Sequence, residues 1–438
     1  MVKQLPLSGK IFYGIGAGGW NLIDRLLITY LLYYYVINPI RGEDILVSPF
    51  LFGIIMFLGR IVDAVADPLI GRFSDNHTGK YGRRIPFMIF SALPYTVVFI
   101  ALFYPPVDGS SIINDAYLTF LLAIYFALFT AYVCPYLALL PELAHNPKDR
   151  IDLATFKGVF SILGVAIAFI GGGLLIENYG PVAMIWIMGL LGMIFLYIPA
   201  LIKERNYAEA KPATLGLKEA MVTTFKNKPF VIYLFGNIAF WLGFNIVTLN
   251  IPGYVEVLMG KSEGDIAIFF GAVLGVAFIC FPFINIAGKK FGLKAVMMAS
   301  LIIFVIFLPA LFFLGEEIIP GLSPDITAFI VMAVLGIPVS AIFVVPDAIV
   351  AAVSDLEEKM TGMRREGMYF GAQGFLMKMS LGISTVITGA LLEFFGSTAA
   401  NPLGIQLTGP VAAFFVLIGL IVFSRYPEKE VQLKKNVN

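Results

Sequence analysis

Long apolar runs separated by short polar connections extend along the whole chain. Each run has about 20 residues or more, enough for a helix to cross the hydrocarbon core of a bilayer. Lipid offers no hydrogen-bond partner to an open backbone, so each run is predicted to be a transmembrane helix. The twelve runs are Ile11–Val36, Phe50–Arg72, Ile85–Phe103, Tyr117–Leu140, Asp152–Ile176, Pro181–Ile202, Phe230–Met259, Asp265–Ala287, Leu293–Leu314, Ile326–Val353, Gly367–Leu392 and Gly404–Ser424.

The longest polar connection, Lys203–Pro229, divides these runs into two sets of six. It has no apolar period and is predicted to be a cytoplasmic linker. The expected fold is therefore an all-α integral membrane protein with two pseudo-symmetric six-helix bundles, residues 1–202 and 230–438, joined by residues 203–229. Two-fold repetition of this kind is typical of secondary transporters with a binding site near the bilayer midplane.

The positions of lysine and arginine predict the orientation. Most of the 30 lysines and arginines fall in the tails and in the connections on one side. The connections on the other side hold only Arg41 and Lys261. Because positive residues gather on the cytoplasmic side, both termini are expected in the cytoplasm of a multi-pass cell-membrane protein.

Composition narrows the class of protein. Of 438 residues, 59% are hydrophobic and 13% are charged, about half the charged share of soluble domains. These values exclude a soluble enzyme, a disordered chain and a nucleic-acid binder. With two cysteines in apolar runs and two histidines in polar connections, neither a cofactor nor a multi-histidine metal site is expected. Nothing in the sequence indicates an obligate protein partner.

Charged residues inside the apolar runs are costly in a membrane, so each is expected to have a partner or a function. Arg60, Asp63 and Asp67 are spaced by three and four residues and share one helix face. Two carboxylates one turn apart can bind Na⁺ or Li⁺, or can share a proton. The alternative is an ion pair with Arg60 that only holds helices together. One arginine cannot neutralise two carboxylates, which favours the cation site.

The first run contains Trp20, Asn21, Asp24 and Arg25. An aromatic ring beside hydrogen-bonding groups suits a sugar, which stacks its C–H face and bonds through its hydroxyls. Equally, Asp24 and Arg25 can neutralise each other while Trp20 packs in the core. The sequence leaves both interpretations open.

Two lysines lie within later runs. Lys378 is deep in the eleventh run, so we expect it to face a cavity or a carboxylate. Lys157 is the sixth residue of the fifth run, where it can either serve a site or extend to the cytoplasmic surface.

The stretch Gly59–Gly71, followed by Asp75 and Gly82–Phe87, resembles the glycoside–pentoside–hexuronide:cation symporters, the family of melibiose permease within the major facilitator superfamily. Tyr33–Tyr35 and Gly362–Gly367 add to the resemblance, which covers the whole chain. It implies the major facilitator fold. It also implies that Asp63 and Asp67 bind the cation, with Thr130 supplying a hydroxyl ligand.

The resemblance further implies that Lys157 takes the place of a cytoplasmic-side arginine and that Lys378 lies near the sugar site. Ala66 stands where sodium-using members often have asparagine, which favours a proton or Li⁺. Asn21 and Val133 stand where galactoside carriers have sugar-binding acids. These departures indicate an anionic or differently hydroxylated glycoside, such as a glucuronide or pentoside.

A set of charged residues is expected to have gating or structural roles. Asp75, Arg83 and Arg84 resemble the cytoplasmic loop motif of the superfamily, in which an acid can pair with a basic side chain and hold one conformation. The alternative is that the arginines only set the orientation. Arg60 and Arg364 complete the expected set.

The sequence thus predicts a transporter, not an enzyme, that couples uptake of a sugar or glycoside to Na⁺, Li⁺ or H⁺ by alternating access. A membrane enzyme would carry acids or histidines at a membrane face, and a channel would carry a pore-lining ring. Two alternatives remain open: a carrier of lysolipids or other amphipathic solutes, and an uncoupled facilitator.

Overall fold

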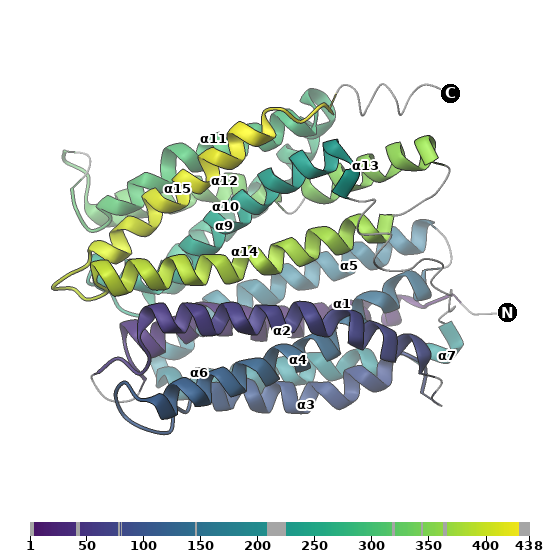
Figure 1. Ribbon diagram of the computed structural model, residues 1–438, viewed down its shortest axis with the longest axis horizontal. Coiled ribbons are helices and arrows are strands. Elements are labelled where there is room, and N and C mark those ends of the chain that lie inside the picture. The colour runs from purple at the N-terminus through teal and green to yellow at the C-terminus, as the bar shows by residue number, and fades with distance from the viewer. Residues whose placement is uncertain are drawn as a thin grey trace. The chain divides into compact units, whose positions relative to one another are not determined.

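A computed structural model describes residues 4–40, 44–77, 79, 81–144, 147–207, 225–317, 320–342, 345–361 and 366–428. The regular elements of these residues are all helices (Figure 1). The chain divides into two compact units. The first unit is Met1–Ala213 with Ser262–Ala267, and the second is Thr214–Lys261 with Ile268–Asn438.

Long helices build the first unit, and several end in a short π or 3₁₀ segment. They are α1 (Leu7–Leu32) with η1 (Tyr33–Ile37), α2 (Pro49–Asn76), α3 (Ile85–Leu102), α4 (Ile112–Leu143), α5 (Pro147–Ala166) with η2 (Ile167–Gly171), α6 (Gly172–Tyr197) with η3 (Ile198–Leu201), and the short α7 (Glu204–Tyr207).

The second unit has the same construction. Its helices are α9 (Lys228–Gly253) with η4 (Tyr254–Leu258), α10 (Asp265–Phe291), α11 (Leu293–Phe307) with η5 (Leu308–Phe313), α12 (Pro324–Ile342), α13 (Val345–Thr361), α14 (Glu366–Phe395) and α15 (Leu403–Phe423). The first three residues of α10 group with the first unit.

Among the described residues, ten helical segments are long and apolar enough to cross a membrane. One of them, Asp152–Leu201, has 50 residues and breaks at Gly180, where φ is 79° and ψ is 169°. It therefore holds two of the predicted spans. α1 is not among the ten because its polar residues and glycines lower its mean hydropathy, yet its 26 residues extend about 39 Å. The predicted all-helical membrane fold is confirmed.

Glycines let α1 pack closely against its neighbours in the first unit. A methyl group added to Gly14 would lie 3.0 Å from the carbonyl oxygen of Phe156 on α5, and one added to Gly18 would lie 3.1 Å from that of Phe160. Small residues allow this backbone approach between membrane helices. The same packing fixes the polar stretch of α1 against α5 and α6.

A glutamate downstream of α6 caps α3. The carboxylate of Glu204 accepts hydrogen bonds from the backbone N–H groups of residues 83–85, at 2.6–3.0 Å. These N–H groups have no partner within the helix, and the positive end of the helix dipole favours a carboxylate there. Gly82 precedes them with φ at 113°, and a side chain at this position would overlap the carboxylate.

The second unit repeats this arrangement. Glu428, beyond α15, accepts hydrogen bonds from the backbone N–H groups of Leu293 at 2.6 Å and Lys294 at 3.1 Å, at the start of α11. Gly292 precedes them with φ at 92°, and a methyl group there would lie 2.6 Å from the carboxylate. In each unit, therefore, the segment after the last long helix closes back onto the start of the third.

Candidate functional site

A buried charged cluster joins α1, α2 and α4 of the first unit. The carboxylate of Asp63 lies between two partners: Arg60 donates to Oδ2 at 3.2 Å, and the hydroxyl of Thr130 donates to Oδ1. Thr130 is also 3.3 Å from the carbonyl oxygen of Asp63. Asp63 has no exposed surface. The structure thus brings together the hydroxyl and the carboxylate that the resemblance implies as cation ligands.

Arg60 is shared between two acids. It also donates to Oδ1 of Asp24 on α1 at 3.3 Å, and its guanidinium lies 4.3 Å from the centre of the Phe126 ring. Asp24 and Arg60 are each 3% exposed. A buried arginine held by two carboxylates and an aromatic face is well compensated. The pairing of Arg60 with Asp63 is the helix-internal contact that the spacing predicts, whereas the pairing with Asp24 is not evident from spacing.

Asp67 lies one turn beyond Asp63 on α2 and is half-buried. Its carbonyl oxygen accepts a hydrogen bond from Sγ of Cys134 on α4 at 3.7 Å. The two carboxylates therefore differ in environment: Asp63 is fully enclosed, and Asp67 is partly accessible. An acid pair of this kind can hold a monovalent cation or a proton.

The polar residues Trp20, Asn21, Asp24 and Arg25 of α1 differ in the contacts that their side chains make. Asn21 donates to the carbonyl oxygen of Ala17 at 2.9 Å, on its own helix. Arg25 is 4.0 Å from Asp24, which places Asp24 between two arginines. The ring of Trp20 packs edge-on against Phe129, 5.9 Å between centres. Its indole N–H is buried without a partner among the described residues.

The remaining predicted substrate residues belong to different helices. Lys157 on α5 of the first unit and Lys378 on α14 of the second are both half-buried. Each of the two lysines interacts with neighbouring groups. Arg364 lies outside the described residues.

Three of the predicted gating residues, Asp75, Arg83 and Arg84, meet near the end of α2. Arg84 forms an ion pair with Asp75 and donates through Nε to Glu142 at 2.9 Å. Arg83 donates to the same carboxylate at 2.6 Å. Sequence reasoning missed Glu142 on α4. An acid directly after the proline at the end of an apolar run was the available signal.

A second acid that sequence reasoning missed lies in the connection before α10. Glu263 accepts hydrogen bonds from the hydroxyls of Tyr34 at 2.8 Å and Tyr33 at 3.2 Å, and from the amide of Asn38 at 3.2 Å. It belongs to the segment Ser262–Ala267, which groups with the first unit. Burial raises the pKa of Glu263 above its ordinary value of 4.5, partly offset by the hydrogen bond from Tyr34.

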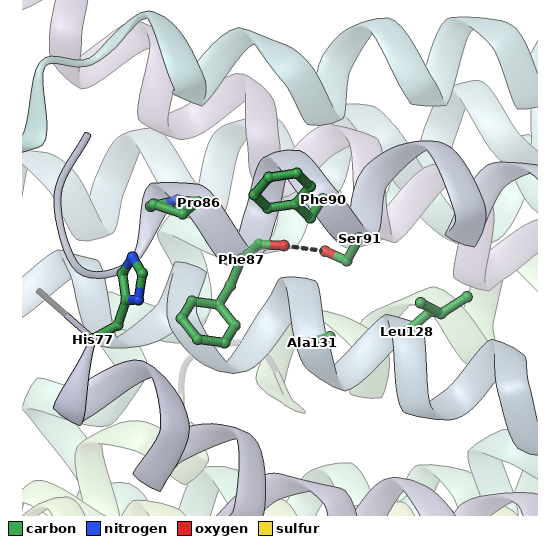
Figure 2. A pocket seen from close by; sticks show the side chains of 7 residues that line it. All are labelled: His77, Pro86, Phe87, Phe90, Ser91, Leu128 and Ala131. Atoms are coloured by element: carbon green, nitrogen blue, oxygen red, sulfur yellow. Dashed lines mark hydrogen bonds between the residues drawn. The ribbon is translucent and has the colours of Figure 1, made fainter. Parts of the chain in front are cut away.

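An apolar pocket of about 330 Å³ is lined by the first turns of α3 and by the middle of α4 (Figure 2). Its lining includes Phe87, Phe90 and Leu128, with His77 as the titratable side chain among them. The hydroxyl of Ser91 donates to the carbonyl oxygen of Phe87 at 2.7 Å, so it already has a partner. The pocket offers mainly apolar contacts and includes none of the predicted site residues.

Comparison with known proteins gives a consistent result. The profile of the family described as MFS/sugar transport protein matches residues 12–427. The isoprimeverose transporter of Lactiplantibacillus pentosus is 25% identical over 441 residues, covering 96% of this chain and 87% of the relative. The putative glycoside/cation symporter YagG of Escherichia coli is 24% identical over 443 residues, covering 97% and 91%.

A solved structure shares the fold. The bacterial homologue of the human lysosomal transporter Spinster, in an inward-facing and unoccupied conformation, aligns with a TM-score of 0.70 and 14% sequence identity. The alignment covers the whole of both chains. At this identity the likeness concerns the arrangement of helices alone.

Proposed function

Because the chain belongs to the MFS/sugar transport protein family, we propose that it carries a sugar or glycoside across the membrane together with a monovalent cation. The observation that carries this proposal is the enclosed carboxylate of Asp63, held between Arg60 and Thr130. Relatives named as an isoprimeverose transporter and a putative glycoside/cation symporter support the substrate class and the coupling.

The coupling follows from competition for one carboxylate. A cation or proton that binds Asp63 takes over the charge compensation that Arg60 supplies. Arg60 keeps Asp24 as its second partner at 3.3 Å, so it does not become an uncompensated buried charge. The bound cation changes the relative stability of the two conformations of the carrier. Its gradient then drives uptake through a shared conformational equilibrium.

The ligands are assigned by chemistry. We assign the cation to Asp63, Asp67 and Thr130, and the coupling ion is Na⁺, Li⁺ or H⁺. Ala66 supplies no side-chain oxygen beside them. We assign the substrate to Trp20, Asn21, Asp24, Lys157 and Lys378, where aromatic, amide and charged groups suit a polyhydroxylated and anionic solute.

The remaining assignments concern topology. We propose cytoplasmic termini, bundles at residues 1–202 and 230–438, and a gating role for the cluster of Asp75, Arg83 and Arg84. The ion pair of Asp75 with Arg84 and the excess of basic residues on that side support this. The same gating set includes Arg364.

Thermal unfolding of the detergent-purified protein tests the function. The panel is isoprimeverose, methyl β-xyloside, methyl β-glucuronide and a lysophospholipid, each with and without Na⁺ or Li⁺ and at two pH values. A ligand that binds only the folded state raises the midpoint. We expect one sugar to act, with a shift that grows with the cation, and Asp63→Asn to remove that growth. A shift produced by the lysophospholipid alone would contradict sugar transport.

A further inference from the structure

The first helices of the two units have the same length and end in the same way. α1 and α9 each have 26 residues, and each continues into a π-helix of 5 residues, η1 and η4. α1 begins at Leu7 and α9 begins at Lys228, so equivalent residues differ by 221 positions. π-helices are rare and occur frequently at functional sites. Because α1 and α9 match in length and in the π-helix that follows each of them, they can be compared residue by residue.

In this comparison Trp20 on α1 corresponds to Trp241 on α9. The chain has only three tryptophans, so two of them occupy equivalent positions. Each packs edge-on against a phenylalanine: Trp20 against Phe129 at 5.9 Å, and Trp241 against Phe244 at 5.7 Å.

Both indole N–H groups are buried and have no hydrogen-bond partner among the residues that the structure describes. The third tryptophan differs, because Nε1 of Trp186 donates to the hydroxyl of Tyr104 at 2.8 Å. A buried donor without a partner costs free energy, and such groups are rare in native proteins. Two unpaired donors at equivalent positions indicate that each awaits an acceptor supplied by a ligand.

The second unit also has a buried hydrogen-bond acceptor close to Trp241 in the sequence. Asn237 lies four residues before Trp241, on the same face of α9. Asn237 is 1% exposed, and its Oδ1 is buried with no partner in the described part of the chain. A hydroxyl group both donates and accepts a hydrogen bond. Neighbouring hydroxyls of a polyol can therefore satisfy the oxygen of Asn237 and the N–H of Trp241 together, while the indole ring packs against sugar C–H groups.

We infer that Trp241 and Asn237 form a polyol-binding contact on the second unit, with Trp20 as the corresponding donor on the first. The N–H of Trp241 donates to a sugar oxygen, and Oδ1 of Asn237 accepts from a sugar hydroxyl. This contact rests on the proposed sugar transport. It extends the substrate residues to α9, a helix in which the sequence pattern predicts none.

Fluorine NMR of the full-length protein labelled with 5-fluorotryptophan tests the contact directly. The protein should give three resonances, each assigned by a tryptophan-to-phenylalanine variant. Isoprimeverose, methyl β-xyloside and methyl β-glucuronide are added in turn. We expect a sugar that stabilises the protein to shift the resonance of Trp241 and to leave that of Trp186 unchanged.

Affinity measurements complete the test. Trp241→Phe keeps an aromatic ring and removes the N–H, so we expect the Kd of that sugar to rise about tenfold, equivalent to about 1.4 kcal/mol. Asn237→Leu should also raise the Kd. It takes the place of Trp241→Phe in the test if that variant does not fold. Trp186→Phe is the matched control and should leave the Kd unchanged.

The outcomes are distinguishable. A sugar that binds tightly without moving the Trp241 resonance, and with equal Kd in Trp241→Phe and the unmodified protein, overturns the contact and leaves sugar transport standing. If the unmodified protein binds none of the three sugars, the proposed function fails, and the contact fails with it.

Discussion

Asp24 on α1 and Arg60 on α2 are linked by a hydrogen bond of 3.3 Å inside the first unit, although 36 residues separate them in the chain. Asp24 therefore acts on the candidate cation site without touching it. It holds the arginine that otherwise neutralises Asp63 alone, and its negative charge lowers the local potential around that carboxylate.

Asp24→Asn should weaken cation binding. Without this charge, Arg60 pairs with Asp63 alone. Arg60 then competes more strongly with an incoming cation for the carboxylate of Asp63. We expect the concentration of Na⁺ or Li⁺ that gives half of the sugar-dependent thermal shift to rise about tenfold, equivalent to about 1.4 kcal/mol. Asp24→Glu keeps the charge and is the control. Loss of sugar affinity in the absence of cation, with unchanged cation dependence, would instead mark Asp24 as a substrate ligand only.

Thr130→Val should also weaken the cation dependence, because valine matches threonine in shape and lacks the hydroxyl that contacts Asp63. Loss of one oxygen ligand from a small site should reduce the apparent cation affinity by about 1 kcal/mol or more. Thr130→Ser keeps the hydroxyl and should retain most of the affinity. Equal cation dependence in the valine and serine variants would argue against Thr130 as a ligand.

Glu204→Ala should destabilise the first unit. It leaves the three N–H groups at the start of α3 without their carboxylate partner, at a cost of about 1–3 kcal/mol. The midpoint of thermal unfolding should fall by about 2–4 °C per kcal/mol. Glu428→Ala makes the equivalent change at α11 and should act in the same direction. An unchanged midpoint in both variants would show that these caps contribute no stability.

Packing of the segment Ser262–Ala267 should depend on pH through Glu263. Burial raises the pKa of this carboxyl above 4.5, so the packed form binds a proton more tightly than an unpacked form does. Packing is therefore most favourable below pH 4.5 and weakens as the pH rises through the raised pKa. Hydrogen exchange of the backbone amides of this segment, corrected for intrinsic rates, should show protection that decreases from pH 5 to pH 7.5.

Glu263→Gln is the decisive variant for that pH dependence. Glutamine keeps an acceptor for Tyr34 and cannot ionise, so the segment should be equally protected at both pH values. Asp265→Asn, in the same segment, removes an acid that accepts from Ser262 at 3.1 Å and should keep the dependence on pH. Protection that increases with pH in the unmodified protein would contradict the assignment to Glu263.

Local signals predicted most of the fold. The glycine and proline at positions 180 and 181 mark the break inside Asp152–Leu201, and the structure turns at Gly180. The pairing of Arg60 with Asp63 follows from a spacing of three residues on one helix. By contrast, the π-helices η1 and η4 are changes in backbone hydrogen-bond register, for which apolar helical residues give no distinct signal.

The sequence pattern could not predict contacts between residues that are far apart in the chain. Glu142, Glu204 and Glu263 each bind groups far away along the chain. An acid in a polar connection looks the same whether it is solvated or buried against a helix end. Thr130 was identified only through a resemblance, since a single hydroxyl in an apolar run carries no charge that demands a partner. The internal charges could be found because a membrane makes each of them costly.

The caps on α3 and α11 have a consequence for biosynthesis. The carboxylate that caps α3 comes from 121 residues downstream, and the one that caps α11 from 135 residues downstream. While the ribosome is still producing the intervening helices, the start of each third helix exposes N–H groups that only water or lipid headgroups can satisfy. Each half of the protein therefore completes its folding only after its last membrane helix has been synthesised.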